Sequence, residues 1–171
     1  MIADSLCARM NVLTAKDFGE IKQLASEIWN AYYVGIVSKE QIDYMLADRY
    51  TDENLLGYLN SSDRWFSLLR ISERIAGYCS YASTENPGEI KLEQLYVLPE
   101  LHGNGLGRLM LSHIENHTRN LNLSTLVLQV NKQNIKAISF YRKAGFGVRE
   151  EAVFDIGNGF FMDDYVMEKK L

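Results

Sequence analysis

Hydrophobic positions in the first sixty residues follow the period of amphipathic helices. Apolar side chains recur at spacings of three and four from residue 18 to 32, and two shorter runs follow before residue 60. Thr14, Ser38 and Thr51 stand just before these runs, where a hydroxyl side chain satisfies unpaired N–H groups of the first helical turn. The pattern therefore predicts three helices, preceded by a short strand.

The middle of the chain changes to the pattern of strands. Residues 65–71 and 75–81 carry apolar and aromatic residues on either side of a turn at 72–74. Asn86-Pro87-Gly88 is a strong turn signal, and residues 90–98 form the next predicted strand, which ends before a proline. Antiparallel pairing of these strands is the simplest expectation.

Helices and strands alternate in the last third. A helix is predicted over about residues 105–120, a buried strand over 126–130, and a second helix from about Asn134 to Gly145. Two further strands surround residues 157–159. This order predicts an α/β fold, with a mixed, mostly antiparallel sheet of about six or seven strands and helices on both faces. Without linkers or repeats, residues 1–171 read as one domain.

Composition excludes several classes of protein. No apolar run approaches the roughly 18 residues of a membrane span, and the N-terminal residues lack the pattern of a signal peptide. Cys7 and Cys79 do not make a disulfide framework, so a cytoplasmic location is expected. A net charge of −4 argues against nucleic acid as the partner and is compatible with a cationic substrate.

A glycine-rich turn lies between the predicted strand 90–98 and the following helix. Its residues are His102, Gly103, Asn104, Gly105, Leu106, Gly107 and Arg108. Glycines let backbone N–H groups approach a ligand closely, and a helix N-terminus adds partial positive charge, so the turn suits phosphate or pyrophosphate. The spacing fits neither the dinucleotide fingerprint nor the P-loop.

Three motifs together resemble the GNAT superfamily of N-acetyltransferases. The stretch from His102 to Gly107 is similar to the family's glycine motif, with His102 in place of the usual Gln or Arg. The preceding 92–100 looks like its central strand, and 131–146 matches its second cofactor motif. The resemblance covers the second half of the chain well and implies acetyl-CoA as cofactor.

What the resemblance implies can be placed on individual residues. Backbone groups of Leu95, Tyr96 and Val97 would pair with the pantetheine arm, and backbone amides from Gly103 to Arg108 would hold the pyrophosphate. Asn134 would bind the pantetheine arm, Tyr141 would lie near the sulfur, and Lys143 would reach the phosphates. In proteins resembling this one, homodimers are common.

Acetylation of an amine requires an amine without its extra proton, a donor for the developing oxyanion, and protonation of the leaving thiolate. Tyr141 suits the last task, although a purely packing role is the alternative. Glu93, on the predicted central strand, is the candidate base, acting through water, with a solvent-facing carboxylate as the equal alternative.

The acceptor is read from resemblance alone. The C-terminal segment 154–169 resembles bacterial spermine/spermidine acetyltransferases of the PaiA type, which implies a small primary amine. Residues placed where the family contacts acceptors are the aromatic Trp29, Tyr32 and Tyr33 and the acidic Asp155, Asp163 and Asp164. Transfer to a protein N-terminus or lysine, and a non-catalytic acyl-CoA-binding module, remain alternatives.

Two histidines mimic a metal motif. His113 and His117 are four residues apart, but Ile114 occupies the position where zinc proteases carry glutamate. Both lie on the apolar face of the predicted helix, so they are expected to pack, and no metal is predicted.

Overall fold

The computed structural model describes residues 7–171. Seven strands form one sheet in the order β1-β2-β3-β4-β5-β7-β6, and every neighbouring pair is antiparallel except β4 and β5. This confirms the predicted mixed, mostly antiparallel sheet. The strands are β1 (Ala8–Val12), β2 (Arg64–Ile71), β3 (Arg74–Ser83), β4 (Glu89–Val97), β5 (Thr125–Asn131), β6 (Gly147–Gly157) and β7 (Phe160–Lys170).

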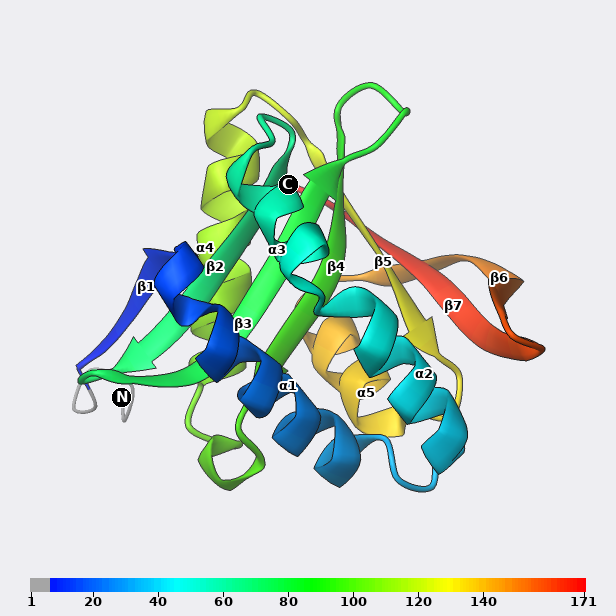
Figure 1. Ribbon diagram of the computed structural model, residues 1–171. Helices are drawn as coiled ribbons and strands as arrows, with labels where there is room; N and C mark the ends of the chain where they lie inside the picture. The colour runs from blue at the N-terminus through cyan, green and yellow to red at the C-terminus, as the bar shows by residue number, and fades with distance from the viewer. Residues whose placement is uncertain (1–6) are drawn as a thin grey trace.

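Five helices cover the two faces of the sheet (Figure 1). They are α1 (Phe18–Tyr32), α2 (Lys39–Arg49), α3 (Asp52–Leu59), α4 (Leu106–Asn120) and α5 (Ile135–Lys143). Short 3-10 turns precede α1 (Ala15–Asp17) and follow β4 (Pro99–Leu101). Ser38 and Thr51 cap α2 and α3 by accepting hydrogen bonds from Gln41 and Asn54 backbone N–H groups, as the sequence predicts.

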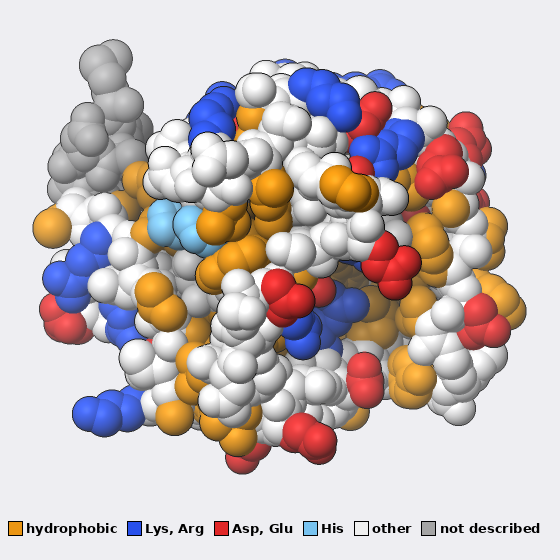
Figure 2. Space-filling model, turned by 90° about the horizontal axis from the view of Figure 1, so that it is seen from above, with side chains coloured by type: hydrophobic (Ala, Val, Ile, Leu, Met, Phe, Trp, Pro, Cys, Tyr) orange, Lys and Arg blue, Asp and Glu red, His pale blue; other side chains and the backbone are white. Residues whose placement is uncertain are grey.

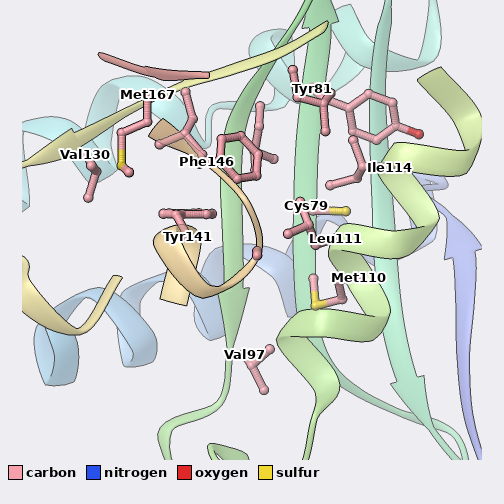
Figure 3. Close-up of a cluster of buried hydrophobic side chains, with 14 of the residues drawn as sticks. Cys79, Tyr81, Val97, Met110, Leu111, Ile114, Val130, Tyr141, Phe146 and Met167 are labelled. Carbon is pink, nitrogen blue, oxygen red and sulfur yellow. The ribbon is translucent and has the colours of Figure 1, made fainter. Parts of the chain in front are cut away.

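Two hydrophobic clusters lie on opposite faces of the sheet. α1, α2 and α3 pack on one face, where Trp29 and Ile42 are buried with side chains of β2 and β3. α4 and α5 pack on the other, and Figure 3 shows residues of this second cluster, including Met110, Val130 and Tyr141. Helices on both faces therefore agree with the prediction.

The central strands separate part of the way along the sheet. β4 and β5 are paired only from Glu89 with Thr125 to Leu92 with Leu128. Beyond that point β4 continues along β3 to Val97, while β5 continues along β7 to Asn131. Because β4 and β5 are paired at one end and apart at the other, they enclose a V-shaped opening. The unpaired backbone groups of β4 are within reach of a ligand in this opening.

A β-bulge begins where the strands separate. Ser80 is opposite Gln94 and Tyr81 is opposite Leu92, so Glu93 is the extra residue on β4. The bulge shifts the alternation of side chains, because Leu92 and Val97 both belong to the cluster beneath α4 although their spacing is odd. Glu93 and Gln94 consequently both turn toward the α1–α3 side.

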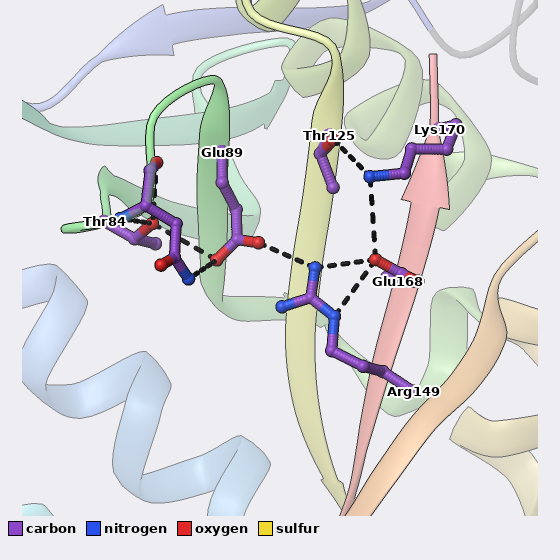
Figure 4. Close-up of polar contacts among 7 residues, drawn as sticks. Thr84, Glu89, Thr125, Arg149, Glu168 and Lys170 are labelled. Atoms are coloured by element: carbon purple, nitrogen blue, oxygen red, sulfur yellow. Dashed lines mark hydrogen bonds and ion pairs between the residues drawn. The ribbon is translucent and has the colours of Figure 1, made fainter.

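Polar side chains link the strands at the closed end of the V (Figure 4). The Arg149 guanidinium on β6 binds Glu89 of β4 at 2.7 Å and Glu168 of β7 at 2.6 Å. Burial opposes ionisation of Glu89, but Arg149 together with hydrogen bonds from Asn86 and Thr84 outweighs that effect, and the pKa of Glu89 is lowered. Lys170 extends the network by donating to Thr125 of β5. These contacts tie four strands together at the end where β4 and β5 are paired.

Candidate active site

A cavity of about 480 Å³ occupies the opening between β4 and β5. Its lining divides into two parts that we name by position. The turn side is formed by residues of the glycine-rich turn and α5, among them His102, Gly103, Gly105, Asn134 and Tyr141. The β7 side is formed by Glu93, Gln129, Met162 and Asp164, and the C-terminal end of α1 adds Tyr32 and Tyr33.

The glycine-rich turn has the backbone that its sequence predicts. Gly103 and Gly105 have φ values of 81° and 78°, a region that disfavours residues with a Cβ atom. A Cβ added to either glycine would have no heavy atom within 4 Å, so open space adjoins the turn. Gly105 is also the N-cap of α4, whose first N–H groups face that space without a side-chain cap. The turn therefore fits a pyrophosphate, and the free edge of β4 fits an extended arm.

Side chains around the turn are held by hydrogen bonds. His102 donates from Nε2 to the carbonyl oxygen of Val97 at 2.9 Å, which fixes the turn against the end of β4. Asn134 caps α5 by accepting from the Ala137 N–H, and it also accepts from the Tyr32 hydroxyl at 3.0 Å. The second of these bonds connects α1 with α5 across the cavity.

Tyr141 lies on α5 and reaches both the core and the cavity. Its side chain is buried beside Phe146, with ring centroids 5.5 Å apart (Figure 3). Tyr141 also lines the turn side of the cavity. Burial raises the pKa of Tyr141 far above its ordinary value. The hydroxyl therefore keeps its proton at neutral pH and is available as a donor.

Glu93 lines the cavity, but one oxygen of its carboxylate is already engaged. The Tyr58 hydroxyl on α3 donates to Oε2 at 2.7 Å, and the Arg64 guanidinium lies 3.8 Å from the same atom. The neighbouring bulge residue Gln94 is held similarly, because Tyr50 donates to its Oε1 at 2.6 Å. Tyrosines from the helical layer thus hold both side chains of the bulge.

Asp164 on β7 has different surroundings. Its side chain is 4% exposed and lines the cavity, and its Oδ1 atom has no hydrogen-bond partner among residues 7–171. Burial, with a smaller contribution from the adjacent Asp163 carboxylate, raises the pKa of Asp164 to about 6. A buried acceptor atom without a partner is costly in a folded protein, so the described residues leave the Asp164 carboxylate incompletely satisfied.

Several residues proposed from the sequence lie outside the cavity lining. Trp29 is 1% exposed and belongs to the core under α1. Asn104 hydrogen-bonds the Leu101 carbonyl within the turn, and Lys143 lines a separate, smaller depression on α5. Asp155 lies on the β6–β7 hairpin, where it accepts a hydrogen bond from the Gly157 N–H.

Sequence reasoning missed other parts of the lining, of which Gln129, Met162 and Lys136 are examples. Their residue types carry no motif, and only the separation of the strands brings them to the cavity. The bulge did have a signal, because the apolar positions Leu92 and Leu95 are three residues apart where a regular strand has two.

The two histidines of α4 pack as expected. His117 lies against the rings of Trp65 and Tyr81, and His113 is within 3.3 Å of the Ser67 hydroxyl. Among residues 7–171, no group of three or more His, Cys, Asp or Glu side chains is arranged to hold a metal ion. Cys79 is buried, and burial raises its pKa to about 12, as expected for an inert core thiol. No helix in this part of the chain has the length and apolarity needed to cross a membrane.

Charges of both signs gather on one face of the molecule. Figure 2 shows a hollow on this face in which basic and acidic side chains lie next to one another. Lys91 is a half-buried cation of β4 that lies on the same side of the strand as Glu93, and burial lowers its pKa. The Lys91 charge also acts on Asp164, whose pKa it lowers.

Comparison with known proteins identifies the family to which this fold and cavity correspond. The acetyltransferase (GNAT) family matches residues 21–146. A spermidine N(1)-acetyltransferase of Thermoplasma acidophilum is 28% identical over 162 residues, which cover 92% of this chain and 94% of that protein. An IAA acetyltransferase of Azospirillum brasilense is 31% identical over 114 residues, or 64% and 74% of the two chains.

A solved structure shares the same fold. The PaiA N-acetyltransferase from Thermoplasma acidophilum, crystallised in complex with coenzyme A, superposes with a TM-score of 0.82. Sequence identity is 25%, and the match covers 96% of this chain and 99% of that one. The family match spans the splayed strands, the glycine turn and α5, which are the features that fit the cofactor. The chain therefore belongs to the GNAT family of acetyltransferases and uses acetyl-CoA as its acetyl donor.

Proposed function

We propose that this enzyme transfers the acetyl group of acetyl-CoA directly to a primary amine of a small cationic molecule, of the polyamine class. The observation that carries the proposal is the β7 side of the cavity, where the buried Asp164 carboxylate has an unpaired oxygen. An ammonium group in the cavity would compensate the charge of this carboxylate, and the aromatic side chains of Tyr32 and Tyr33, which line the same cavity, would favour a cation. The similarity to a spermidine acetyltransferase supports the same class of acceptor.

The residues on the turn side would hold the donor. Acetyl-CoA, when bound, supplies an acetyl group activated as a thioester. Backbone groups of Leu95, Tyr96 and Val97 would hold its pantetheine arm, with Asn134 as a further partner, and the amides from Gly103 to Arg108 would hold its pyrophosphate. Openness at the two glycines supports this assignment.

Tyr141 would provide the proton that the leaving sulfur requires. Its hydroxyl is protonated at neutral pH because burial raises its pKa, and the side chain lines the cavity beside Asn134. A donor at this position lowers the barrier to breaking the thioester bond, because a thiol is a better leaving group than an unprotonated thiolate in an apolar site.

Thiol release from acetyl-CoA across a panel of amines tests the proposal. The panel contains spermidine, spermine, an aminoglycoside, single amino acids and a peptide with a free N-terminus. Spermidine or spermine is expected to give the highest kcat/KM. A preference for the peptide would replace the proposal with a protein acetyltransferase, and no acceleration by any amine, with coenzyme A still bound, would refute amine acetylation.

A further inference from the structure

Two carboxylates reach the cavity, and their surroundings suit them to different tasks. Glu93 accepts a hydrogen bond from Tyr58 at 2.7 Å and lies 3.8 Å from the Arg64 guanidinium. The Arg64 guanidinium also lies over the Tyr58 ring, 4.2 Å from its centroid, so the three side chains form one cluster. The Oε2 atom of Glu93 is therefore already occupied by side chains of the protein.

Asp164 lacks such compensation. Its Oδ1 atom is buried and has no hydrogen-bond partner among residues 7–171, whereas the exposed Asp163 beside it binds Lys132 at 2.6 Å. Lys132 also binds Glu151 at 2.8 Å, so this cation is shared by two other carboxylates. Successive residues of a strand face opposite sides of the sheet, which separates Asp164 from that ion-pair cluster.

Other ionisable groups around Asp164 come from the end of α1, from β4 and from the residue that follows β5. At the end of α1, the Tyr33 hydroxyl is close enough for the negative charge of Asp164 to raise the Tyr33 pKa. The same hydroxyl is hydrogen-bonded to the Tyr96 hydroxyl at 2.9 Å. From β4, the Lys91 ammonium partly offsets the charge of Asp164, as Lys132 does from beyond β5. Burial and Asp163 outweigh both cations, so a proton binds Asp164 more readily than it binds an ordinary aspartate.

We propose that Asp164, and not Glu93, accepts the proton from the ammonium group of the acceptor. The inference rests on the proposed function, because it concerns the same cavity and an amine acceptor. Its basis is the place of Asp164 in the cavity lining and the absence of a hydrogen-bond partner for its buried Oδ1, together with the contacts that occupy Oε2 of Glu93. Glu93 is then a positioning residue, which acts through Tyr58 to hold the bulge.

The proton and bond changes balance. One proton moves from the acceptor ammonium to Asp164, which leaves a neutral amine with a free electron pair. As the nitrogen-to-carbon bond forms, the bond from the acetyl carbon to sulfur breaks, and the Tyr141 hydroxyl gives its proton to that sulfur. The second proton lost by nitrogen restores Tyr141, and Asp164 releases its proton to solvent. The sum is one amide, one thiol and one proton.

A pH profile of kcat/KM with matched variants tests the assignment. The wild-type enzyme is expected to lose activity as pH falls through about 6, because protonated Asp164 accepts no proton. Asp164→Asn should reduce kcat about 100-fold or more and lose this acidic limb. Glu93→Gln, the same chemical change on the other carboxylate, should cost less than about tenfold and keep the limb. The reverse result in the two variants would overturn the proposal.

Two measurements need no turnover. In the carboxyl NMR spectrum of the acetyl-CoA-free protein, the resonance missing from Asp164→Asn should titrate near pH 6, and titration near 4 would overturn the proposal. Because the pKa of Asp164 is higher in the folded protein than in the unfolded chain, the stability that its protonated form provides is lost as pH rises through 6. Asp164→Asn should therefore unfold at a higher temperature than the wild type at pH 8. The difference between the two unfolding temperatures should be smaller at pH 5.

These outcomes separate the inference from the proposed function. If the wild type acetylates no amine, the proposed function fails whatever the NMR titration shows. If it acetylates an amine and Asp164→Asn is as active as Glu93→Gln with an unchanged acidic limb, only the assignment of the base fails. Calorimetry with spermidine gives a further criterion, since Asp164→Asn should weaken its binding at pH 8 by about tenfold or more.

Discussion

The two sides of the cavity are built from different parts of the polypeptide. On the turn side, the ligand-facing groups are mainly backbone N–H groups, presented by Gly103 and Gly105 with positive φ and by the start of α4. On the β7 side they are side chains, with Asp164 unpaired and Glu93 engaged by Tyr58. A backbone site tolerates sequence change and serves a constant donor, whereas a side-chain site changes with single substitutions and suits a variable acceptor.

Tyr141→Phe gives the largest expected effect, because Tyr141 is the chemical link between the two sides. Loss of the hydroxyl removes the proton donor and should lower kcat about 100-fold. Since the ring still packs against Phe146, coenzyme A affinity measured by calorimetry should stay within about threefold of wild type. Equal turnover in the variant would remove Tyr141 from the chemistry and leave it as a core aromatic.

Gly105→Ala tests whether the turn side depends on backbone geometry. Alanine at a φ of 78° should cost about 1–2 kcal/mol of strain and weaken coenzyme A binding about tenfold, while kcat at saturation changes little. Gly88→Ala is the matched control, because Gly88 also has positive φ (83°) and an open Cβ position but lies in the β3–β4 turn, away from the cavity. Equal losses of affinity in both variants would show a stability effect without a role in binding.

Arg149→Met tests the closed end of the V, where β4 and β5 are paired and from which both sides of the cavity extend. The substitution leaves the buried Glu89 without its guanidinium partner and should lower the free energy of unfolding by about 1–3 kcal/mol. Denaturation with urea measures the loss. Because the lowered pKa of Glu89 gives stability only while it is ionised, the difference from wild type should shrink as pH falls below about 4.5.

The smallest expected effect concerns two histidines of α4 that do not line the cavity. Burial lowers the pKa values of His113 and His117, and their mutual repulsion adds to the shift of His113. Protonation therefore favours the unfolded chain, so wild-type stability should fall as pH drops below about 6.5. His117→Phe should reduce that fall by less than about 1 kcal/mol, as followed by thermal unfolding. If the double variant His113→Phe/His117→Phe lost as much stability at low pH as the wild type, the loss would be due to other groups.

Local features were predictable because neighbouring residues decide them. Helix capping at Ser38 and Thr51 depends on groups three residues away, and the glycine-rich turn depends on the φ freedom of its own residues. Periodicity likewise predicts the helices and the order of strands. The resemblance carried by residues 92–146 adds the donor, because backbone motifs are local in sequence.

Only the tertiary structure decided which acidic residues reach the cavity. Asp155 and Asp164 looked alike in the sequence, yet one lies in the β6–β7 hairpin and the other lines the site. Nothing in the sequence near Glu93 indicates that Tyr58, 35 residues away, and Arg64 hold its carboxylate. The sequence by itself determined the acetyl donor, because the motifs that bind it are local. The burial and the hydrogen-bond partners of a carboxylate depend on which distant residues pack against it, so only the fold determined the surroundings of the carboxylates that face the acceptor.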